Sequence, residues 1–397
     1  MALRYRTWSR IRRFGSLGIS FFALSLLLFF WSLKKHKDYW AEREVADYYE
    51  KHPVILSWTR WFGESLSAEL TRFDSRYPCE YRCTFTDDRR LLKYAKALVF
   101  HDKDINIADL PPVDRSKINV YYNMESPDYS EKAFYALPMD FFQWTLTYRQ
   151  ESTVWKPFDK MEEIEKLTEE WERWTEEEVL ERMKLKKKEV LQFVSKCKSK
   201  SQREDYTAHL QKHINVTVIG KCAQDSAPCE RYSECEGENI ASHYFYLAFE
   251  DSVCVDFVTE KAFLLKDLIV PVVLSYRAIN SQLLEGSYIA ADDYLGPEDL
   301  AKRLKYLIAH KEEYMEHFEW TRKYKRSKAV SRHSCEICEA LLKGRQFPEE
   351  KDIHGWWKRD AHCEEQNFVV RLGVPQPPPP LVKKLRPFYG DDDYERI

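Results

Sequence analysis

The chain has almost no net charge. Its 62 Lys and Arg residues nearly balance 65 Asp and Glu residues, for a formal charge of −3. Nucleic-acid binding depends on a cationic excess that releases counterions, so this balance argues against it. The rest of the composition, 44% hydrophobic and 32% charged, is that of a globular protein. At 397 residues, the chain is long enough for two domains with full cores.

A second Cys-x-x-Cys motif is also missing. Cys335 and Cys338 have the spacing of a zinc knuckle, but no second pair completes a zinc site. Ten cysteines in one chain are more typical of disulfides, which form in an oxidising compartment. The sequence therefore favours disulfides over zinc, and it leaves their pairing open.

No charged residue occurs between positions 14 and 33. At ~1.5 Å per helical residue, this segment is long enough to cross a bilayer core. No small-residue cleavage site follows it, and Lys34 and Lys35 do, so a signal-anchor is favoured over a cleaved signal peptide. Arginines before the span predict a cytoplasmic tail at 1–13 and a lumenal body.

The remaining chain divides by pattern. Residues 34–52 are polar and are interpreted as a stem. Alternating strand patterns predict an N-terminal α/β domain over 53–158, with strands at 54–58, 97–100 and 118–122. Residues 159–189 are dense in Glu and Lys, which predicts a solvated helical connector. Residues 331–397 contain Cys and Pro and are interpreted as a tail.

Residues 190–330 alternate strand and helix patterns, as a Rossmann-like domain does. Strands are expected at 190–194, 216–220, 244–249, 270–274 and 288–291. Helices are expected at 203–214, 259–268 and 297–320. Ser201 with Glu204 forms a capping-box pattern for the first helix, and Thr259 is the expected cap of the second.

The run from Phe249 to Lys261 is the most informative segment. It contains four acids and one lysine directly after an apolar strand pattern. In an open α/β sheet, ligands bind at the carboxyl ends of the strands. Glu260 and Lys261 at a helix start would suit a diphosphate, because free amides and a cation meet there. Surface charge complementarity is the alternative interpretation.

Three further positions could carry chemistry. Glu125 follows an apolar strand, and Pro127 keeps Ser126 extended, so the carboxylate lies on a loop where a general base could work. Arg203 in a first helical turn could bind phosphate oxygens. The alternative interpretations are that Glu125 is an ordinary acid in a turn and that Arg203 is a surface arginine. Residues 144–149 alternate and predict a half-buried strand, which either places Arg149 at the site or is merely a strand.

Two short motifs carry less weight. Asp102-Lys-Asp104 matches a metal-binding motif that arises easily in a chain with many acids. Asn215-Val-Thr217 is the only N-glycosylation sequon, and it overlaps a predicted buried strand. Its use is doubtful unless the corner between helix and strand is exposed.

Several segments occur in the order seen in one enzyme family. They are Met124–Pro127, Trp144–Arg149, Val194–Cys197 followed by Arg203, Val218–Cys222, Phe249–Lys261, Val270–Leu274, Tyr288–Asp293 and Tyr314–Trp320. From about residue 54 to 324, the chain resembles the alpha-1,3-fucosyltransferases. The motif at 249–261 is the specific one, and the others support it jointly.

The resemblance implies a GT-B architecture, with two Rossmann-like domains facing across a cleft. It implies inverting transfer of fucose from GDP-β-L-fucose to a hydroxyl of N-acetylglucosamine in a glycan. Glu125 would be the general base, and Arg203 and Lys261 would neutralise the departing diphosphate. Glu260 would hold fucose or ribose hydroxyls, with Asp251 and Phe257 also on the donor side.

The resemblance also implies Trp144 and Arg149 on the acceptor side and no obligatory metal, although a divalent metal could stimulate. The expected location is the Golgi membrane, with one anchor, a lumenal catalytic body and no nucleic-acid partner.

The chain departs from the family pattern at three places. Asp251 replaces an Asn, Phe257 replaces a Tyr, and Arg149-Gln-Glu-Ser152 followed by Thr153 stands where the family has Arg-Arg-Asp-Ser-Asp. These changes keep open two alternatives, a catalytically degenerate member that binds glycans or partners and an enzyme for another donor sugar. The acceptor, whether the core GlcNAc of N-glycans or Lewis-type LacNAc, stays open.

Overall fold

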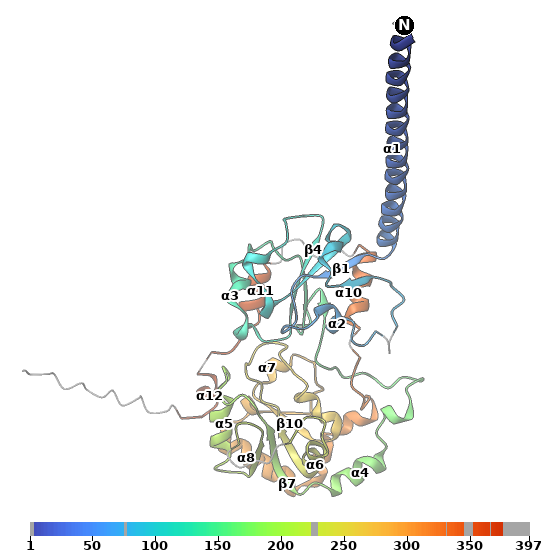
Figure 1. Cartoon of the computed structure of the whole chain (residues 1–397). Coiled ribbons are helices and arrows are strands. Elements are labelled where there is room, and N and C mark those ends of the chain that lie inside the picture. Colours follow the sequence, from blue (N-terminus) through green and yellow to red (C-terminus); the bar gives the residue numbers. More distant parts are fainter. Residues whose placement is uncertain are drawn as a thin grey trace, which may run out of the picture. The chain divides into compact units, whose positions relative to one another are not determined.

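The structure is a computed structural model that describes residues 4–74, 78–223, 229–330, 332–344, 352–365 and 367–375, with side chains from residue 28 onward. The chain divides into two compact units (Figure 1). Unit 1 comprises residues 1–162, 254–260 and 328–363, and unit 2 comprises residues 163–253, 261–327 and 364–397. Each unit therefore takes in segments that lie far apart in the sequence.

Unit 1 contains a six-stranded parallel sheet in the order β2-β1-β3-β4-β5-β6. Its strands are β1 Val54–Ser57, β2 Thr84–Thr86, β3 Ala95–His101, β4 Ile118–Asn123, β5 Trp144–Thr147 and β6 Val154–Trp155. Its α-helices are α1 Arg4–Lys51, α2 Leu66–Leu70, α3 Lys132–Ala136, α10 His333–Leu342 and α11 Ile353–Lys358. Short 3-10 turns are η1 Arg89–Tyr94, η2 Asp102–Asp104, η3 Ile107–Asp109 and η4 Pro127–Tyr129. The strands predicted in this part of the chain are confirmed.

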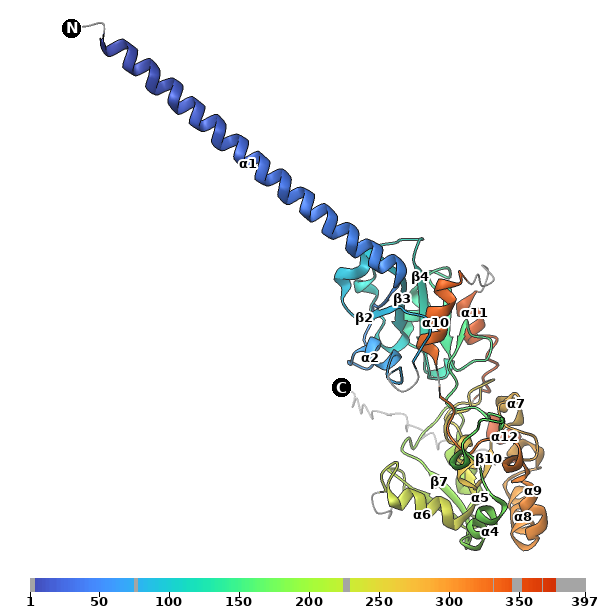
Figure 2. The same ribbon diagram turned by 90° about the vertical axis from the view of Figure 1, so that its right-hand side faces the viewer.

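Both faces of this sheet are buried. Successive side chains of a strand point to opposite faces, so Tyr121 and Tyr122 of β4 enter different hydrophobic clusters. Trp357 of α11 lies in the cluster of Tyr121, and Ile337 of α10 lies in the cluster of Tyr122. In both views, α10 and α11, coloured orange to red, lie beside the blue and cyan strands (Figures 1 and 2). Much of the segment interpreted from the sequence as a tail thus completes the core of unit 1.

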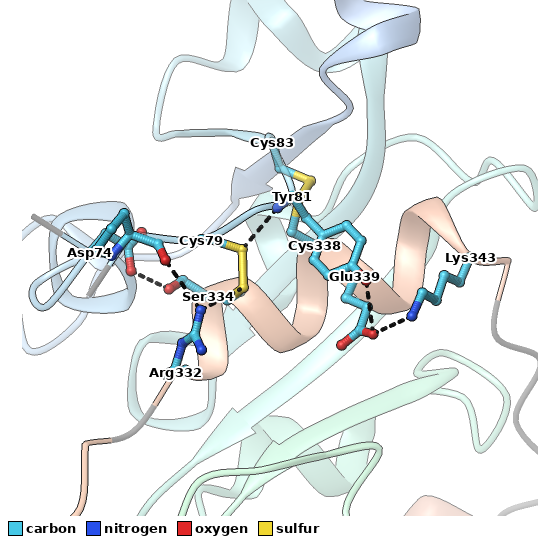
Figure 3. Close-up of a disulfide and its surroundings, with 11 residues drawn as sticks. Asp74, Cys79, Tyr81, Cys83, Arg332, Ser334, Cys338, Glu339 and Lys343 are labelled. Carbon is cyan, nitrogen blue, oxygen red and sulfur yellow. Dashed lines mark hydrogen bonds and ion pairs between the residues drawn. A yellow bond between two sulfur atoms is a disulfide. The ribbon is translucent and has the colours of Figure 1, made fainter. Parts of the chain in front are cut away.

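All ten cysteines form disulfides, as the sequence predicts. The pairs are Cys79–Cys335, Cys83–Cys338, Cys197–Cys222, Cys229–Cys235 and Cys254–Cys363. The first two join the loop before β2 to helix α10, and Ser334 donates a hydrogen bond to Asp74 at the same place (Figure 3). Cys335 and Cys338 therefore bind sulfur partners and no zinc.

Unit 2 contains a five-stranded parallel sheet in the order β11-β10-β9-β7-β8. Its strands are β7 Lys188–Phe193, β8 Val216–Ile219, β9 His243–Leu247, β10 Val270–Val273 and β11 Ile289–Ala290. Its α-helices are α4 Glu176–Lys184, α5 Arg203–Leu210, α6 Glu234–Ser242, α7 Tyr276–Ile279, α8 Pro297–Ala309, α9 Lys311–Glu316 and α12 Phe368–Arg371. Its 3-10 turns are η5 Glu170–Glu172, η6 Ala262–Asp267, η7 Ala291–Asp293 and η8 Glu319–Arg322. The predicted strands of this half are confirmed in type and order.

The predicted helices of unit 2 need correction. The helix expected at 259–268 is the 3-10 turn η6, which begins at Ala262, and Thr259 does not cap it. The helix expected at 297–320 is divided into α8, α9 and η8. Within 159–189, the α-helix is α4, which Thr175 and Glu178 start with a capping box.

The predicted capping box at Ser201 is also wrong. Gln202 occupies the cap position of α5 in the left-handed region, with φ 53° and no side-chain cap. The Ser201 hydroxyl donates instead to the carbonyl of Glu250, at 2.6 Å. The pattern therefore marked a loop that is bound to the acidic segment after β9.

The predicted membrane anchor at 14–33 falls within helix α1. Side chains before residue 28 lie outside the described part of the chain. Among the residues that the structure describes, no helix combines the length and apolarity needed to cross a membrane.

Candidate functional site

Glu125 lies just beyond the carboxyl end of β4 in unit 1. Its side chain is half-buried, and the chain bends there before the 3-10 turn η4 begins at Pro127. Because Pro127 starts the turn and Ser126 is extended, with φ −69° and ψ 156°, the carboxylate stays on a loop at the sheet edge. This is the place that the sequence predicts for a general base.

A buried chain of hydrogen bonds holds the backbone of Glu125. Its N–H donates to Asn123 Oδ1 at 2.8 Å, and Asn123 Nδ2 donates to the Tyr121 hydroxyl at 2.9 Å. The Tyr121 hydroxyl in turn donates to Asp102 Oδ1 at 3.0 Å. Asn123, Tyr121 and Asp102 have no exposed surface. The loop of the candidate base is therefore anchored on a buried carboxylate in the turn that follows the neighbouring strand β3.

Asp102 has an unusual protonation behaviour for an aspartate. Burial raises its pKa to about 6, although the hydrogen bonds from the Glu131 N–H and from Tyr121 act in the opposite direction. Asp104 uses its carboxylate elsewhere, with His101 Nδ1 at 2.6 Å and the Phe62 N–H at 2.9 Å. Asp102 and Asp104, the two acids of the possible metal motif, thus have separate partners. Asp102 belongs to the hydrogen-bond chain that holds the Glu125 loop.

Phe257 of the acidic segment belongs to the core of unit 1. Its ring lies 5.1 Å from that of Tyr148 and 6.3 Å from that of Phe158, and 4% of the residue is exposed. The Tyr148 hydroxyl is buried and has no hydrogen-bond partner within the described residues. Burial raises the Tyr148 pKa well above its ordinary value. The position of Phe257 thus favours packing over direct contact with a donor.

Arg149 and Trp144 are buried as well. Arg149 donates hydrogen bonds to the carbonyls of Trp356 and Asp360, and its guanidinium lies 4.4 Å from the Trp356 ring centre. Trp144 is packed in the core on the α10 side of the sheet. These positions favour a structural role for both residues, with Arg149 joining the end of β5 to α11 and to the residues just after it.

Segment 254–260 is fastened to unit 1 by two further links. Cys254 forms a disulfide with Cys363. Asp256 accepts hydrogen bonds from the backbone and the side chain of Gln150, both at 3.0 Å. Glu260, at the end of this segment, is half-buried. Gln150, one of the departures from the family pattern, is therefore a partner of the acidic segment.

Unit 2 gathers charges beyond the carboxyl ends of β7 and β9. Lys261 Nζ lies 2.8 Å from Glu250 Oε2, and Lys196 Nζ lies 2.7 Å from Asp251 Oδ2. Ser201 binds the same segment through its N–H, which donates to the Asp251 carbonyl at 2.9 Å. Two lysines and two carboxylates thus meet at the sheet edge where an α/β domain binds its ligand.

Arg203 lies against the same segment from the start of α5. Its Nη1 donates to the Phe249 carbonyl at 2.7 Å, while Nε is buried without a partner among the described residues. Only 5% of Arg203 is exposed. Its guanidinium braces the strand end and keeps one buried donor that a ligand oxygen could accept from.

The structure therefore brings Arg203, Asp251 and Lys261 together in unit 2. Glu125, Phe257 and Glu260, with Trp144 and Arg149, belong to unit 1. Lys196 was missed as a site residue, although a lysine two residues after a predicted buried strand was a usable signal. The Asp102–Tyr121–Asn123 chain had no such signal, because alternation in a strand does not show which polar atoms meet.

Two family models match the chain, one in each half. Residues 50–159 match "Fucosyltransferase, N-terminal", and residues 183–356 match "Glycosyltransferase family 10 (fucosyltransferase) C-term". Together, these ranges take in more than half of the chain.

Individual proteins resemble the chain over most of its length. It is 28% identical to "Glycoprotein 3-alpha-L-fucosyltransferase A" of Drosophila melanogaster, over 74% of this chain and 58% of that protein. It is 28% identical to "Alpha-(1,3)-fucosyltransferase C" of the same organism, over 80% of this chain and 81% of that protein. The chain thus spans less than two thirds of the first relative's length and more than two thirds of the second relative's length.

A solved structure described as an alpha1,3-fucosyltransferase with GDP-fucose is similar with a TM-score of 0.47 and 14% identity, covering 75% of this chain and 91% of that one. The family assignment does not depend on this likeness, since the two sequence models carry it. With both the N-terminal and the C-terminal halves matched in order, the chain belongs to glycosyltransferase family 10, the fucosyltransferases.

Proposed function

We propose that this chain transfers L-fucose from GDP-β-L-fucose to a hydroxyl of N-acetylglucosamine in a glycan, with inversion. The observation that carries the proposal is the position of Glu125, whose backbone is held by a buried chain of hydrogen bonds on a bend at the carboxyl edge of a parallel sheet. The relatives' names, which are alpha-1,3-fucosyltransferases, support this choice of donor and linkage.

The reaction needs a base on one side of the sugar and charge stabilisation on the other. Glu125 would take the proton of the acceptor hydroxyl, whose oxygen forms a bond to the anomeric carbon of fucose. The bond from that carbon to the diphosphate breaks, and GDP leaves with its electron pair. Attack and departure on opposite faces give inversion.

The cations of unit 2 would stabilise the leaving diphosphate. Lys196 and Lys261 now face the carboxylates of Asp251 and Glu250, and a diphosphate could take over these contacts. Arg203 adds a fixed positive charge beside them. Since protein cations can supply this stabilisation, we propose that a divalent metal is not obligatory. Activity that survives EDTA would agree, and complete loss restored by a divalent cation would contradict it.

We further propose that the two parallel sheets are the two halves of a GT-B glycosyltransferase. Unit 1 would contribute the base and the acceptor contacts, and unit 2 would bind GDP-fucose. Two parallel α/β units, each with its polar residues beyond the carboxyl strand ends, support this fold class.

The decisive experiment measures GDP release by the full chain with GDP-fucose and a panel of GlcNAc-containing acceptors. Glu125→Gln should lower turnover by roughly 10²- to 10⁴-fold, because removing a general base has that effect. GDP-fucose binding, measured by calorimetry, should persist in this variant. Asp140→Asn, which changes an exposed carboxylate on another loop of unit 1, is the matched control and should retain activity.

Two results would contradict the proposal. A wild-type chain that binds GDP-fucose but turns over no acceptor would indicate a non-catalytic family member. A chain that fails to bind GDP-fucose yet binds another nucleotide sugar would indicate a different donor.

We propose that the enzyme acts in the Golgi lumen. Five disulfides support an oxidising compartment, because cytosolic proteins rarely keep such bonds. Immunofluorescence against Golgi markers, combined with protease protection of sealed vesicles, tests this location. A chain that is digested in intact vesicles would rule it out.

A further inference from the structure

Asn215 begins the only N-glycosylation sequon of the chain, and the structure exposes it. The residue lies between α5 and β8, outside both elements, and is solvent-exposed. Its backbone is fully engaged, since its N–H donates to Glu189 Oε2 at 2.7 Å and its carbonyl accepts from the Val190 N–H at 3.3 Å. The side-chain amide has no hydrogen-bond partner within the described part of the chain. The backbone is therefore fixed while the amide faces solvent.

The surroundings leave room for a bulky group. β8 is the last strand in the order of the unit 2 sheet, and the strand that pairs with it is β7. Val190 is opposite Val216 in that parallel pair, so Asn215 lies at the amino end of the strands. Lys196 and Glu250 follow the opposite, carboxyl ends of β7 and β9. With ~3.3 Å of rise per residue, the four residues of β8 separate the two edges by on the order of 13 Å.

We propose that Asn215 is N-glycosylated in the lumen of the secretory pathway. Its Nδ2 would form a bond to the anomeric carbon of an oligosaccharide carried on a lipid pyrophosphate, and it would lose one proton. The lipid pyrophosphate leaves with the electron pair of the broken bond. The glycan would lie at the amino end of β8, the last strand in the order of the unit 2 sheet, and proteins commonly protect such edge strands against pairing. This inference rests on the lumenal location proposed above.

The third residue of the sequon shows when the reaction takes place. His243 Nδ1 lies 2.6 Å from the carbonyl of Asn239 and so donates to it, which leaves Nε2 to accept the Thr217 hydroxyl at 2.9 Å. Burial lowers the His243 pKa to about 4, which agrees with a neutral ring. In the folded unit, the Thr217 hydroxyl is committed and its backbone is paired with Leu191. The transfer therefore precedes the pairing of β8 with β7.

The test uses the full chain expressed in a eukaryotic cell and treated with a peptide N-glycosidase. The wild-type protein should shift to higher mobility on treatment, and Asn215→Gln should already run at that position. Thr217→Ser keeps the sequon and should keep the shift, whereas Thr217→Ala should lose it. Enzymatic release in heavy-oxygen water, followed by mass spectrometry, should label residue 215.

A reporter sequon separates the two ways in which the inference could fail. Asp114→Asn creates an Asn-Arg-Ser sequon on an exposed turn of unit 1. If this variant gains a glycan while the wild-type chain has none, Asn215 is not a site and the lumenal location stands. If neither protein carries a glycan, the lumenal location is wrong and the inference falls with it. Fucosyl transfer by Asn215→Gln should equal that of wild type, since the residue lies at the edge away from the charged cluster.

Discussion

Tyr121 connects the candidate base to the interior of unit 1. Its hydroxyl accepts from Asn123 and donates to Asp102, so one oxygen joins these two side chains. Tyr122 follows it in the same strand, is equally buried, and faces the other side of the sheet. The two tyrosines therefore allow the effect of the hydrogen-bond chain to be separated from the effect of burial.

Tyr121→Phe should lower the turnover number by roughly 10- to 100-fold, because a misplaced catalytic group loses activity steeply with distance. The KM for GDP-fucose should stay unchanged, since Tyr121 belongs to unit 1. Loss of the buried partner should also lower the free energy of unfolding by about 1–3 kcal/mol. Tyr122→Phe is the control. Equal turnover in the two variants, at temperatures where both are folded, would show that the chain of hydrogen bonds does not position Glu125.

Asp102 should give the stability of the protein a specific pH dependence. Its pKa is raised from 3.8 to about 6, so the folded protein holds this proton more tightly than the unfolded chain does. The stabilising effect is complete below the unfolded pKa and is lost as the pH rises through about 6. Its full size is on the order of 3 kcal/mol. The denaturation midpoint of wild type should therefore fall relative to Asp102→Asn between about pH 4 and pH 7. A constant difference between the two proteins across this range would refute the shift.

At the scale of the elements, the close approach of β7 and β8 depends on a glycine. Gly220 follows β8 with φ +119°, a conformation that residues with a Cβ rarely adopt. A Cβ there would lie 2.4 Å from the carbonyl oxygen of Val194, which follows β7. The loop that leads to Lys196 is thus packed directly against a position that only glycine fills.

Gly220→Ala should lower the free energy of unfolding by roughly 2 kcal/mol or more, since both the strained φ and the clash oppose it. Gly237 lies inside helix α6, and a Cβ there meets no atom within 4 Å. Gly237→Ala should instead raise stability by about 1 kcal/mol, because alanine is the better helix former. Thermal denaturation of the two variants beside wild type checks both signs. Two shifts of the same sign would contradict the argument.

At the scale of the whole molecule, two parallel disulfides close the same long loop. Cys79–Cys335 and Cys83–Cys338 span 256 and 255 residues, and both join the loop before β2 to α10 (Figure 3). Through them and through α11, the segment 328–363 becomes part of unit 1. The chain thus returns to its first sheet after building the second.

The two disulfides should not contribute additively. Either one alone restricts the unfolded chain by roughly 5 kcal/mol in the loop-entropy account, whereas the second then closes only a short ring, worth roughly 2–3 kcal/mol. Replacing Cys83 and Cys338 by alanine should therefore lower stability by the smaller amount. Replacing all four cysteines should lower it by the sum. Denaturant unfolding of the three proteins measures this, and a first loss as large as the second would exclude the account.

The sequence by itself determined most of the strands and their succession along the chain, because each buried strand is a short apolar run that satisfies its own pattern. It did not predict the short strands β2 and β6 or the order of the strands within each sheet. It also determined the family and the place of Glu125, since the end of β4 and Pro127 are local features. Sequence patterns were less successful with helices. Thr259 and Ser201 have the spacing of helix caps, but neither caps a helix in the structure, and the Ser201 hydroxyl instead donates to the carbonyl of Glu250.

Only the tertiary structure decided which residues meet. The disulfide partners, the packing of Phe257 against Tyr148, and the links from Arg149 to Trp356 and Asp360 join residues up to hundreds of positions apart. The exposure of Asn215 likewise depended on how the corner between α5 and β8 lies in the folded unit. Local propensity and alternation act over a few residues, whereas these contacts are chosen by the fit of whole elements in the folded core.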